Sequence, residues 1–250
     1  MPRPVKRQSC CTPSALRLLE RDGCEEENPM TVVTISRERG SDGALVGQLV
    51  AQHLGYDYVD KEIIEGVFRQ YGMTKFNDIY TSTPGILDMV SYTTLYTIAM
   101  LNEIIEAIAQ RGNVVLVGRG GFAVLGAYSD VLNVRVEAPV SVRVERIMAR
   151  ESLATLDDAM TQVTSDNTMR RKFVQMFYNK RWDDESNFDL IVDTGAQSTE
   201  AAAQQIVDAV TALQQTPAGK DTVTTATLNV DPVLADAVAK AMANPLPHLE

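Results

Sequence analysis

The chain has 250 residues, a net charge of −10 and an apolar content of 45%, enough for one domain with a substantial core. The acidic balance argues against a general nucleic-acid or anionic-membrane surface, and no apolar run approaches the roughly 20 residues of a membrane span. All three cysteines lie upstream of the first apolar run, so the body has no disulfide framework and we expect a cytoplasmic protein.

The two ends of the chain differ from its body. Residues 1–29 begin basic and end acidic, without an apolar stretch long enough for a signal peptide, and we interpret them as a disordered tail. The body is expected to cover residues 30–215. Residues 216–250 are expected to form a linker and one short helix that begins at Asp231-Pro232. Because neither end contains a sheet-forming pattern, we expect a chain trimmed to its body to keep nearly all of its stability.

Five short, continuous apolar runs predict buried parallel strands. These runs are residues 31–36, 56–59, 113–118, 131–138 and 188–193. Segments with helical periodicity lie between them, at residues 43–54, 61–71, 86–111, 140–152, 156–181 and 197–214. Strands that alternate with helices require right-handed crossovers. The sequence therefore predicts an α/β fold with a doubly wound, five-stranded parallel sheet.

The first predicted strand runs into a glycine-containing turn, R-E-R-G-S-D-G, from Arg37 to Gly43. A turn of this kind before a helix presents backbone N–H groups and the positive end of the helix dipole to an anion. The lysine and the hydroxyl residue of the standard phosphate loop are missing, because Gly43 and Leu45 stand at those positions. The turn alone is therefore as compatible with a structural role as with phosphate binding.

Arginines recur at three later places in the chain. Arg119 follows the third predicted strand and is flanked by glycines, and the carboxyl end of a strand is where open α/β sheets bind ligands. We interpret it as an anion-binding residue. Arg146 belongs to a stripe of arginines on one predicted helix, and Arg170 lies on the next. Charged helix faces are often merely exposed to solvent. For these two residues, a functional role and a solvated surface position therefore both stay open.

Four segments together resemble the cytidylate-kinase-like family, a divergent branch of the P-loop nucleoside monophosphate kinases, over residues 31–213. The segments are TISRERGSDGALVGQLVAQHLGYDYVDKEII (34–64), VVLVGRGGFAVL (114–125), APVSVRVERIMARE (138–151) and RWDDESNFDLIVDT (181–194). The resemblance implies the fold of those kinases. It also implies a monophosphate-binding helical insert at residues 72–97 and a lid at residues 151–172.

The resemblance further implies the roles of the first turn. Its donor-phosphate residues would be Ser36, Arg37, Gly40, Ser41 and Gly43. Arg37 or Arg39 is the cation that could replace the missing lysine, since guanidinium grips phosphate with two parallel donors. The alternative for Arg37 is a surface ion pair with Glu38. ATP would be the phosphoryl donor, with Mg²⁺, and Asp42 could help to hold that metal ion.

For the acceptor side, the resemblance implies that Asp60 and Arg119 bind the nucleoside monophosphate, with Arg119 on its phosphate. Asp60 is equally suited to cap the following helix. Arg146 and Arg170 would belong to the lid and, with Arg37, would stabilise the charge of the transferring phosphoryl group. The family has a D-x-x-R pattern in this region. Here the pattern begins at Asp166, but Met169 stands at the arginine position and the arginine follows one residue later, at Arg170.

These observations favour ATP-dependent phosphoryl transfer to a pyrimidine nucleoside monophosphate, CMP by resemblance. The expected partners are therefore nucleotides, with neither nucleic acid nor a membrane among them. Two alternatives stay open. One is a non-catalytic member of the same fold that binds a nucleotide or another phosphate ligand, and the other is a small-molecule kinase with a different acceptor.

Overall fold

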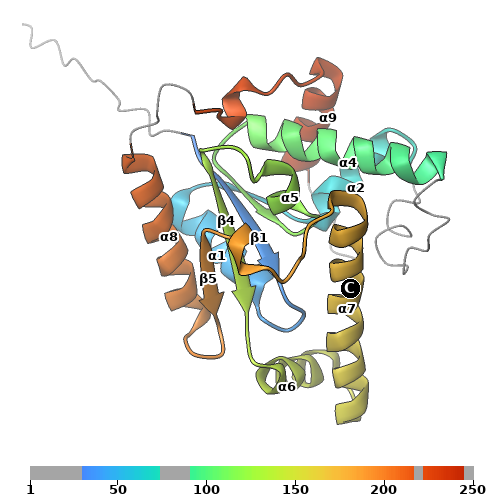
Figure 1. Cartoon of the computed structure of the whole chain (residues 1–250), viewed down its shortest axis with the longest axis vertical. Coiled ribbons are helices and arrows are strands. Elements are labelled where there is room, and N and C mark those ends of the chain that lie inside the picture. Colours follow the sequence, from blue (N-terminus) through green and yellow to red (C-terminus); the bar gives the residue numbers. More distant parts are fainter. Residues whose placement is uncertain (1–29, 74–90, 217–221, 245–250) are drawn as a thin grey trace, which may run out of the picture.

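The computed structural model describes residues 30–73, 91–216 and 222–244 (Figure 1). Its centre is a five-stranded, wholly parallel sheet in the order β2-β3-β1-β4-β5. The strands are β1 Val32–Arg37, β2 Asp57–Val59, β3 Val114–Val117, β4 Val131–Glu137 and β5 Leu190–Asp193. The predicted doubly wound, five-stranded sheet is confirmed. The chain passes from β1 to β2 at one edge of the sheet, returns to β3, and then crosses β1 to reach β4 and β5 on the other side. The connections after β1 and β3 therefore lead to opposite sides, and the carboxyl ends of these two strands lie where ligands bind in such sheets.

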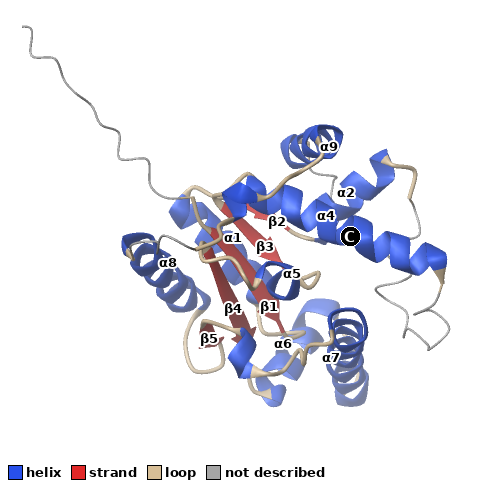
Figure 2. Cartoon of the chain, turned by 45° about the horizontal axis from the view of Figure 1, so that its top comes forward, coloured by secondary structure: helices blue, strands red, loops and turns tan. Residues whose placement is uncertain are grey.

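Helices cover both faces of the sheet, as Figure 2 shows. One face is covered by α1 Gly43–Leu54 and α8 Thr199–Gln215. The other is covered by α2 Lys61–Gln70, α4 Tyr92–Gln110 and α5 Gly121–Leu125. Side chains alternate between these two cores along each strand, so that Val114 and Leu116 face one and Val115 and Val117 the other. Burial on both faces explains why the strands are continuously apolar.

A helical hairpin lies at the carboxyl edge of the sheet, and the C-terminal half of its second helix runs back beside α5 and joins the main core through Phe173 and Val174. The hairpin consists of α6 Val140–Glu151, which lies past the arrowheads of the strands in Figure 1, and α7 Leu156–Tyr178. Thr155 caps α7 by accepting a hydrogen bond from the N–H of Asp158. A small core of its own holds the hairpin together, formed by Val144, Ile147, Ala159 and Val163. This hairpin contains the proposed lid region, residues 151–172.

The observed elements depart from the predicted ranges in a few places. Helix α4 is described from Tyr92, while residues 74–90, which hold most of the proposed insert, lie outside the described residues. Helix α7 ends three residues earlier than predicted, because Asn179 takes a left-handed conformation with φ 50°. Helix α5 was not predicted, since a run of five residues is too short to show periodicity. Among the described residues, no helix is long and apolar enough to cross a membrane.

The C-terminal segment is packed more closely than the sequence suggested. Helix α9, Pro232–Ala243, lies against α2 and α4 and belongs to the same core as the sheet (Figure 2). The short helix η3, Thr225–Thr227, precedes it, and the side chain of Asp130 accepts hydrogen bonds from the N–H and hydroxyl of Thr225. This packing argues against the expectation that a chain trimmed to residues 30–215 keeps nearly all of its stability.

Candidate phosphate-binding site

The turn after β1 is pressed tightly against helix α6. Gly40 has φ +81°, and a Cβ on it would lie 2.7 Å from the carbonyl oxygen of Arg143, so both the conformation and the space require glycine. Ser41 is fully buried, and its hydroxyl donates to the carbonyl oxygens of Glu38 and Val136, each at 3.0 Å. The hydroxyl of Thr194 donates to the carbonyl oxygen of Ser41 at 2.8 Å. Ser41 thus fastens the turn to the end of β4.

The N-terminus of α1 is open to an anion. Asp42 stands at the cap position with φ 60°, but its side chain makes no capping hydrogen bond. The first N–H groups of a helix have no partner within the helix, so those of Gly43 and Ala44 are available to an external acceptor. Gly43 is also required by space, because a Cβ there would lie 2.4 Å from the Cβ of Arg37. The open N-terminus of α1 therefore supports the interpretation that this turn binds an anion.

The carboxylate of Asp42 is turned away from the helix and toward two arginines of α6. It pairs with Arg146 Nε at 3.1 Å and with Arg150. Arg146 also donates to the hydroxyl and the carbonyl oxygen of Thr194, at 3.0 and 2.8 Å, and to the carbonyl oxygen of Gly40 at 3.4 Å. In this conformation Arg146 holds the turn to α6 and to the end of β5.

The side chain of Arg37 crosses from the turn to the end of the neighbouring strand β3. Its guanidinium lies over Gly118, where a Cβ would be 1.8 Å from Nη1. Among the residues that the structure describes, this guanidinium makes no hydrogen bond or ion pair. The alternative interpretation, a surface ion pair between Arg37 and Glu38, is therefore wrong, since Glu38 pairs with Arg135 and Arg143 instead. A half-buried cation that makes neither a hydrogen bond nor an ion pair within the described part of the chain is well suited to bind an anionic ligand.

Arg119 lies next to Arg37 at the end of β3. It is buried, with 4% of its surface exposed, and has φ 54°. Its Nη2 donates to Glu65 Oε1 of helix α2 at 2.9 Å. Glu65 fixes the direction of the guanidinium, and no local pattern predicts this pairing because the two residues are 54 positions apart.

Two pockets meet at this edge of the sheet. The loop pocket, about 220 Å³, is lined by the turn from Arg37 to Gly43 and by residues of α6 and α7. The strand-end pocket lies between β1 and β3 and is lined by Arg37, Arg119 and Arg170, together with Ser36 and the glycines that flank Arg119. Its open space of about 10 Å³ admits roughly one water molecule, because side chains fill it. Arg37 and Arg170 line both pockets.

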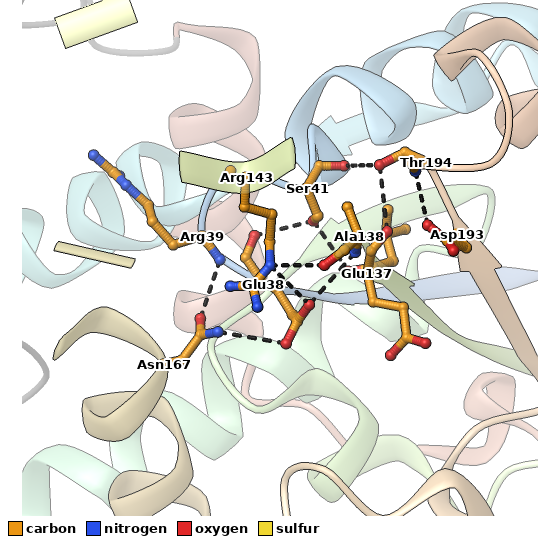
Figure 3. Close-up of polar contacts among 12 residues, drawn as sticks. Glu38, Arg39, Ser41, Glu137, Ala138, Arg143, Asn167, Asp193 and Thr194 are labelled. Carbon is orange, nitrogen blue, oxygen red and sulfur yellow. Dashed lines mark hydrogen bonds and ion pairs between the residues drawn. The ribbon is translucent and has the colours of Figure 1, made fainter. Parts of the chain in front are cut away.

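Glu38 connects the turn to the surrounding elements (Figure 3). Its carboxylate pairs with Arg143 Nε at 3.2 Å and with Arg135 Nη2 at 3.6 Å. It also accepts hydrogen bonds from the N–H of Ala138 and from Asn167 Nδ2, both at 3.4 Å. Because Glu38 has only 15% of its side chain exposed, its charge is compensated by these donors. The carboxylate therefore links the turn to α6, α7 and the end of β4.

The carboxylates of the loop pocket do not fit a metal site as they are arranged. Glu38, Asp42 and Glu151 line the pocket, and each is paired with at least one arginine. Mg²⁺ needs carboxylate oxygens that are free to coordinate it. Among the described residues, no three His, Cys, Asp or Glu side chains form a cluster that could hold a metal ion. The arrangement thus gives no support to Asp42 as a Mg²⁺ ligand.

Asp60 follows β2, the strand next to β3, and caps α2 by accepting a hydrogen bond from the N–H of Glu62 at 3.0 Å. The capping alternative is therefore confirmed, while a role at the acceptor stays a prediction. Burial, followed by the hydrogen bond and charge of Glu62, raises the pKa of Asp60 to about 6.

Asp60 should make stability depend on pH. The folded state holds the proton more tightly than the unfolded state, so the free energy of unfolding should fall as the pH rises from about 4 through 6. Asp60→Asn keeps a capping oxygen and removes the titration. We expect this variant to gain stability relative to the wild type across that interval, as measured by urea unfolding at several pH values. If the free energy of unfolding depended on pH in the same way in both proteins, the raised pKa of Asp60 would be contradicted.

The structure thus brings most of the predicted site residues to one edge of the sheet. Arg37, Gly40 and Gly43 line the loop pocket, while Ser36 and Arg119 line the strand-end pocket. Arg170 of α7 reaches both pockets, and in α6 it is Arg150, rather than Arg146, that lines the loop pocket.

The sheet order, the glycine turn at an open helix N-terminus and the guanidinium groups at the same edge define an α/β protein with the fold of P-loop kinases and a candidate phosphate-binding site. The chain belongs to the cytidylate kinase-like family, whose model matches residues 32–196. It is accordingly a phosphotransferase by family.

Individual relatives agree with this membership. The chain is 28% identical to a cytidylate kinase of Halobacterium salinarum over 73% of its length and 91% of that protein. It is 29% identical to a cytidylate kinase of Pyrococcus horikoshii over 68% of its length and 82% of that protein. A crystal structure of an uncharacterized protein from Eubacterium ventriosum matches with a TM-score of 0.55 and 19% identity, over 72% of this chain and 98% of that one. This last similarity concerns the fold alone.

Proposed function

We propose that the protein transfers a phosphoryl group from ATP to a pyrimidine nucleoside monophosphate, with CMP as the acceptor. The proposal rests on the position of Arg37, which lines both pockets at the carboxyl edge of the sheet. Among the described residues, its guanidinium makes no hydrogen bond or ion pair. A cation shared by two adjacent pockets can contact a phosphoryl group that passes between two anions. The cytidylate kinases among the relatives support CMP as the acceptor.

In the proposed reaction, each pocket binds one substrate. The N–H groups at the start of α1 bind the donor phosphates in the loop pocket, and Arg119, held by Glu65, binds the acceptor phosphate in the strand-end pocket. An acceptor phosphate oxygen forms a bond to the γ-phosphorus of ATP while the bond between that phosphorus and the leaving oxygen of ADP breaks. Arg37 and Arg170 stabilise the negative charge spread over the transferring group.

Substrate entry requires some side-chain movement. The strand-end pocket has room for about one water molecule, so the long arginine side chains must move apart to admit a phosphate group. This is feasible because Arg37 has no hydrogen bond or ion pair to break within the described part of the chain.

The proposal is tested by following ADP formation from ATP with a panel of acceptors, CMP, dCMP, UMP, AMP and GMP, with and without Mg²⁺. We expect ADP formation that depends on a pyrimidine monophosphate and is fastest with CMP. ATP binding without transfer to any acceptor would instead support the binding-module alternative, in line with the missing loop lysine. Transfer only to a non-nucleotide acceptor would support a different small-molecule kinase.

Replacing Arg119 should selectively weaken acceptor binding. Arg119→Ala is expected to reduce the binding free energy of CMP by about 1.5–3 kcal/mol, the range for hydrogen bonds to a charged group, and to change ATP affinity far less. Titration calorimetry with each nucleotide separately measures both effects. Arg111→Ala is a matched control, because that arginine is exposed and pairs only loosely with Asp57, at 3.8 Å. Unchanged CMP affinity in Arg119→Ala would contradict an acceptor site at the end of β3.

A further inference from the structure

The side chain of Asn167 joins three parts of the site. It lies on α7 and is buried, with 8% of its surface exposed. Its Oδ1 accepts hydrogen bonds from the backbone N–H of Arg39 in the turn and from Nη1 of Arg170, both at 3.1 Å. Its Nδ2 donates to Glu38 Oε1 at 3.4 Å. One amide thus connects the backbone and the carboxylate of the turn to an arginine on the hairpin (Figure 3 shows the contacts with the turn).

The chemistry of the three contacts fixes the orientation of this amide. Both groups facing Oδ1 are donors, and the group facing Nδ2 is a carboxylate, so rotating the amide by 180° would turn all three contacts into repulsions. The carboxylate of Glu38 is held in turn by Arg143 and Arg135. The amide is therefore a rigid connector between the turn and α7.

The residue that Asn167 controls on the hairpin is Arg170, which lies one helical turn further along α7. Asp166 also reaches it, with a carboxylate oxygen 3.7 Å from Nη2. Arg170 has only 15% of its side chain exposed and lines both the loop pocket and the strand-end pocket. A guanidinium at that place is useful only if its direction is set relative to the turn, since a displacement of about 1 Å can cost roughly 100-fold in rate.

We propose that Asn167 is a positioning residue, which sets the guanidinium of Arg170 relative to the turn that binds the donor phosphates. The spacing N-x-x-R thereby gives the hairpin a fixed attachment to the turn. This role rests on the proposed function, because it acts through the contact of Arg170 with the transferring group. Asn167 itself does not line either pocket.

The test is a double-mutant cycle on Asn167 and Arg170. Asn167→Ala is expected to lower kcat about tenfold, the effect of losing about 1.4 kcal/mol of transition-state stabilisation, with less than threefold change in either KM. Arg170→Ala should lower kcat further. Because Asn167 acts through Arg170, the double variant should be no slower than Arg170→Ala alone. If the two substitutions act independently, so that kcat of the double variant is about tenfold lower than that of Arg170→Ala, the proposal is overturned.

A second variant separates positioning from a purely structural role. Asn167→Asp has nearly the same shape and keeps the acceptor for Arg39 and Arg170, but it places a carboxylate against Glu38. We expect kcat to fall about as far as in Asn167→Ala, although both acceptors are retained, because repulsion between the new carboxylate and Glu38 displaces the side chain from the turn and Arg170 with it. Gln175→Ala, which removes an exposed amide on the same helix, should leave kcat and the melting temperature unchanged. Reduced melting temperature with unchanged kcat in both Asn167 variants would show a structural role only.

Failure of the proposed function can be told apart from failure of this inference. If the wild-type protein transfers no phosphoryl group, the proposed function fails, and the same cycle is measured in the dissociation constant of ATP. Arg170 lines the loop pocket, so its loss should weaken ATP binding about three- to tenfold. Asn167→Ala should again add nothing once Arg170 is absent. An independent loss of ATP affinity in the double variant would overturn the inference in that case too.

Discussion

Arg37→Ala is expected to lower kcat by about 100- to 1,000-fold, the cost of removing one positioned donor from a developing charge. ATP affinity should change much less, because the backbone N–H groups at the start of α1 remain in place. The contrast follows from the position of the guanidinium, which leaves the turn and lies over Gly118 between the two pockets. Steady-state kinetics with ATP and CMP, together with ATP titration, measures both quantities.

Two variants make this expectation specific. Arg39→Ala removes the other arginine of the turn, which is occupied by ion pairs with Glu151 and with Asp166 at 3.5 Å. We expect it to affect turnover far less than Arg37→Ala. Arg37→Lys keeps the charge and loses the planar pair of donors, so it should fall between the wild type and the alanine variant. If Arg37→Ala keeps kcat within about threefold of the wild type, Arg37 does not stabilise the transferring group.

The fold could be predicted from local patterns, because its strands are buried on both faces. Runs such as Val114–Val117 are continuously apolar and stand between amphipathic segments, and each such pattern corresponds to one strand or helix. Helix α5 carries no such pattern. The packing of α9 was also beyond reach, because the apolar face of a short helix does not reveal what covers it, and its partners α2 and α4 lie more than 100 residues away.

The site was predictable only in part, for a different reason. Glycines and arginines at strand ends, such as Gly40 and Arg119, carry a local signal that identifies the edge of the sheet where ligands bind. Their partners carry none: Glu65 and Asn167 are ordinary polar residues on helices, and only the fold brings them to the arginines. The ion pair between Asp42 and Arg150 of α6 could not be predicted either, because the two residues are 108 positions apart.

A chain that ends at Gln215 is expected to lose a large part of its stability. It lacks α9, in which Leu234, Ala237, Val238 and Ala241 are buried against α2 and α4. Burial of Leu234 and Val238 alone contributes about 3–6 kcal/mol, compared with the roughly 5–15 kcal/mol by which natural domains are stable. Polar contacts are lost as well, among them the hydrogen bond from Gln70 Nε2 to the carbonyl oxygen of Ala237, at 3.1 Å. Urea unfolding of the full and shortened chains measures the difference.

A matched pair of substitutions on α9 tests the same packing without shortening the chain. Val238 has no exposed surface, whereas Val233 on the same helix is 67% exposed. Val238→Ala should lower the free energy of unfolding by about 2 kcal/mol, since it removes two buried methyl groups and leaves a cavity. Val233→Ala should change it by less than about 0.5 kcal/mol, as is usual for surface substitutions. Equal effects of the two substitutions, or a shortened chain within about 1 kcal/mol of the full one, would show that α9 does not stabilise the domain.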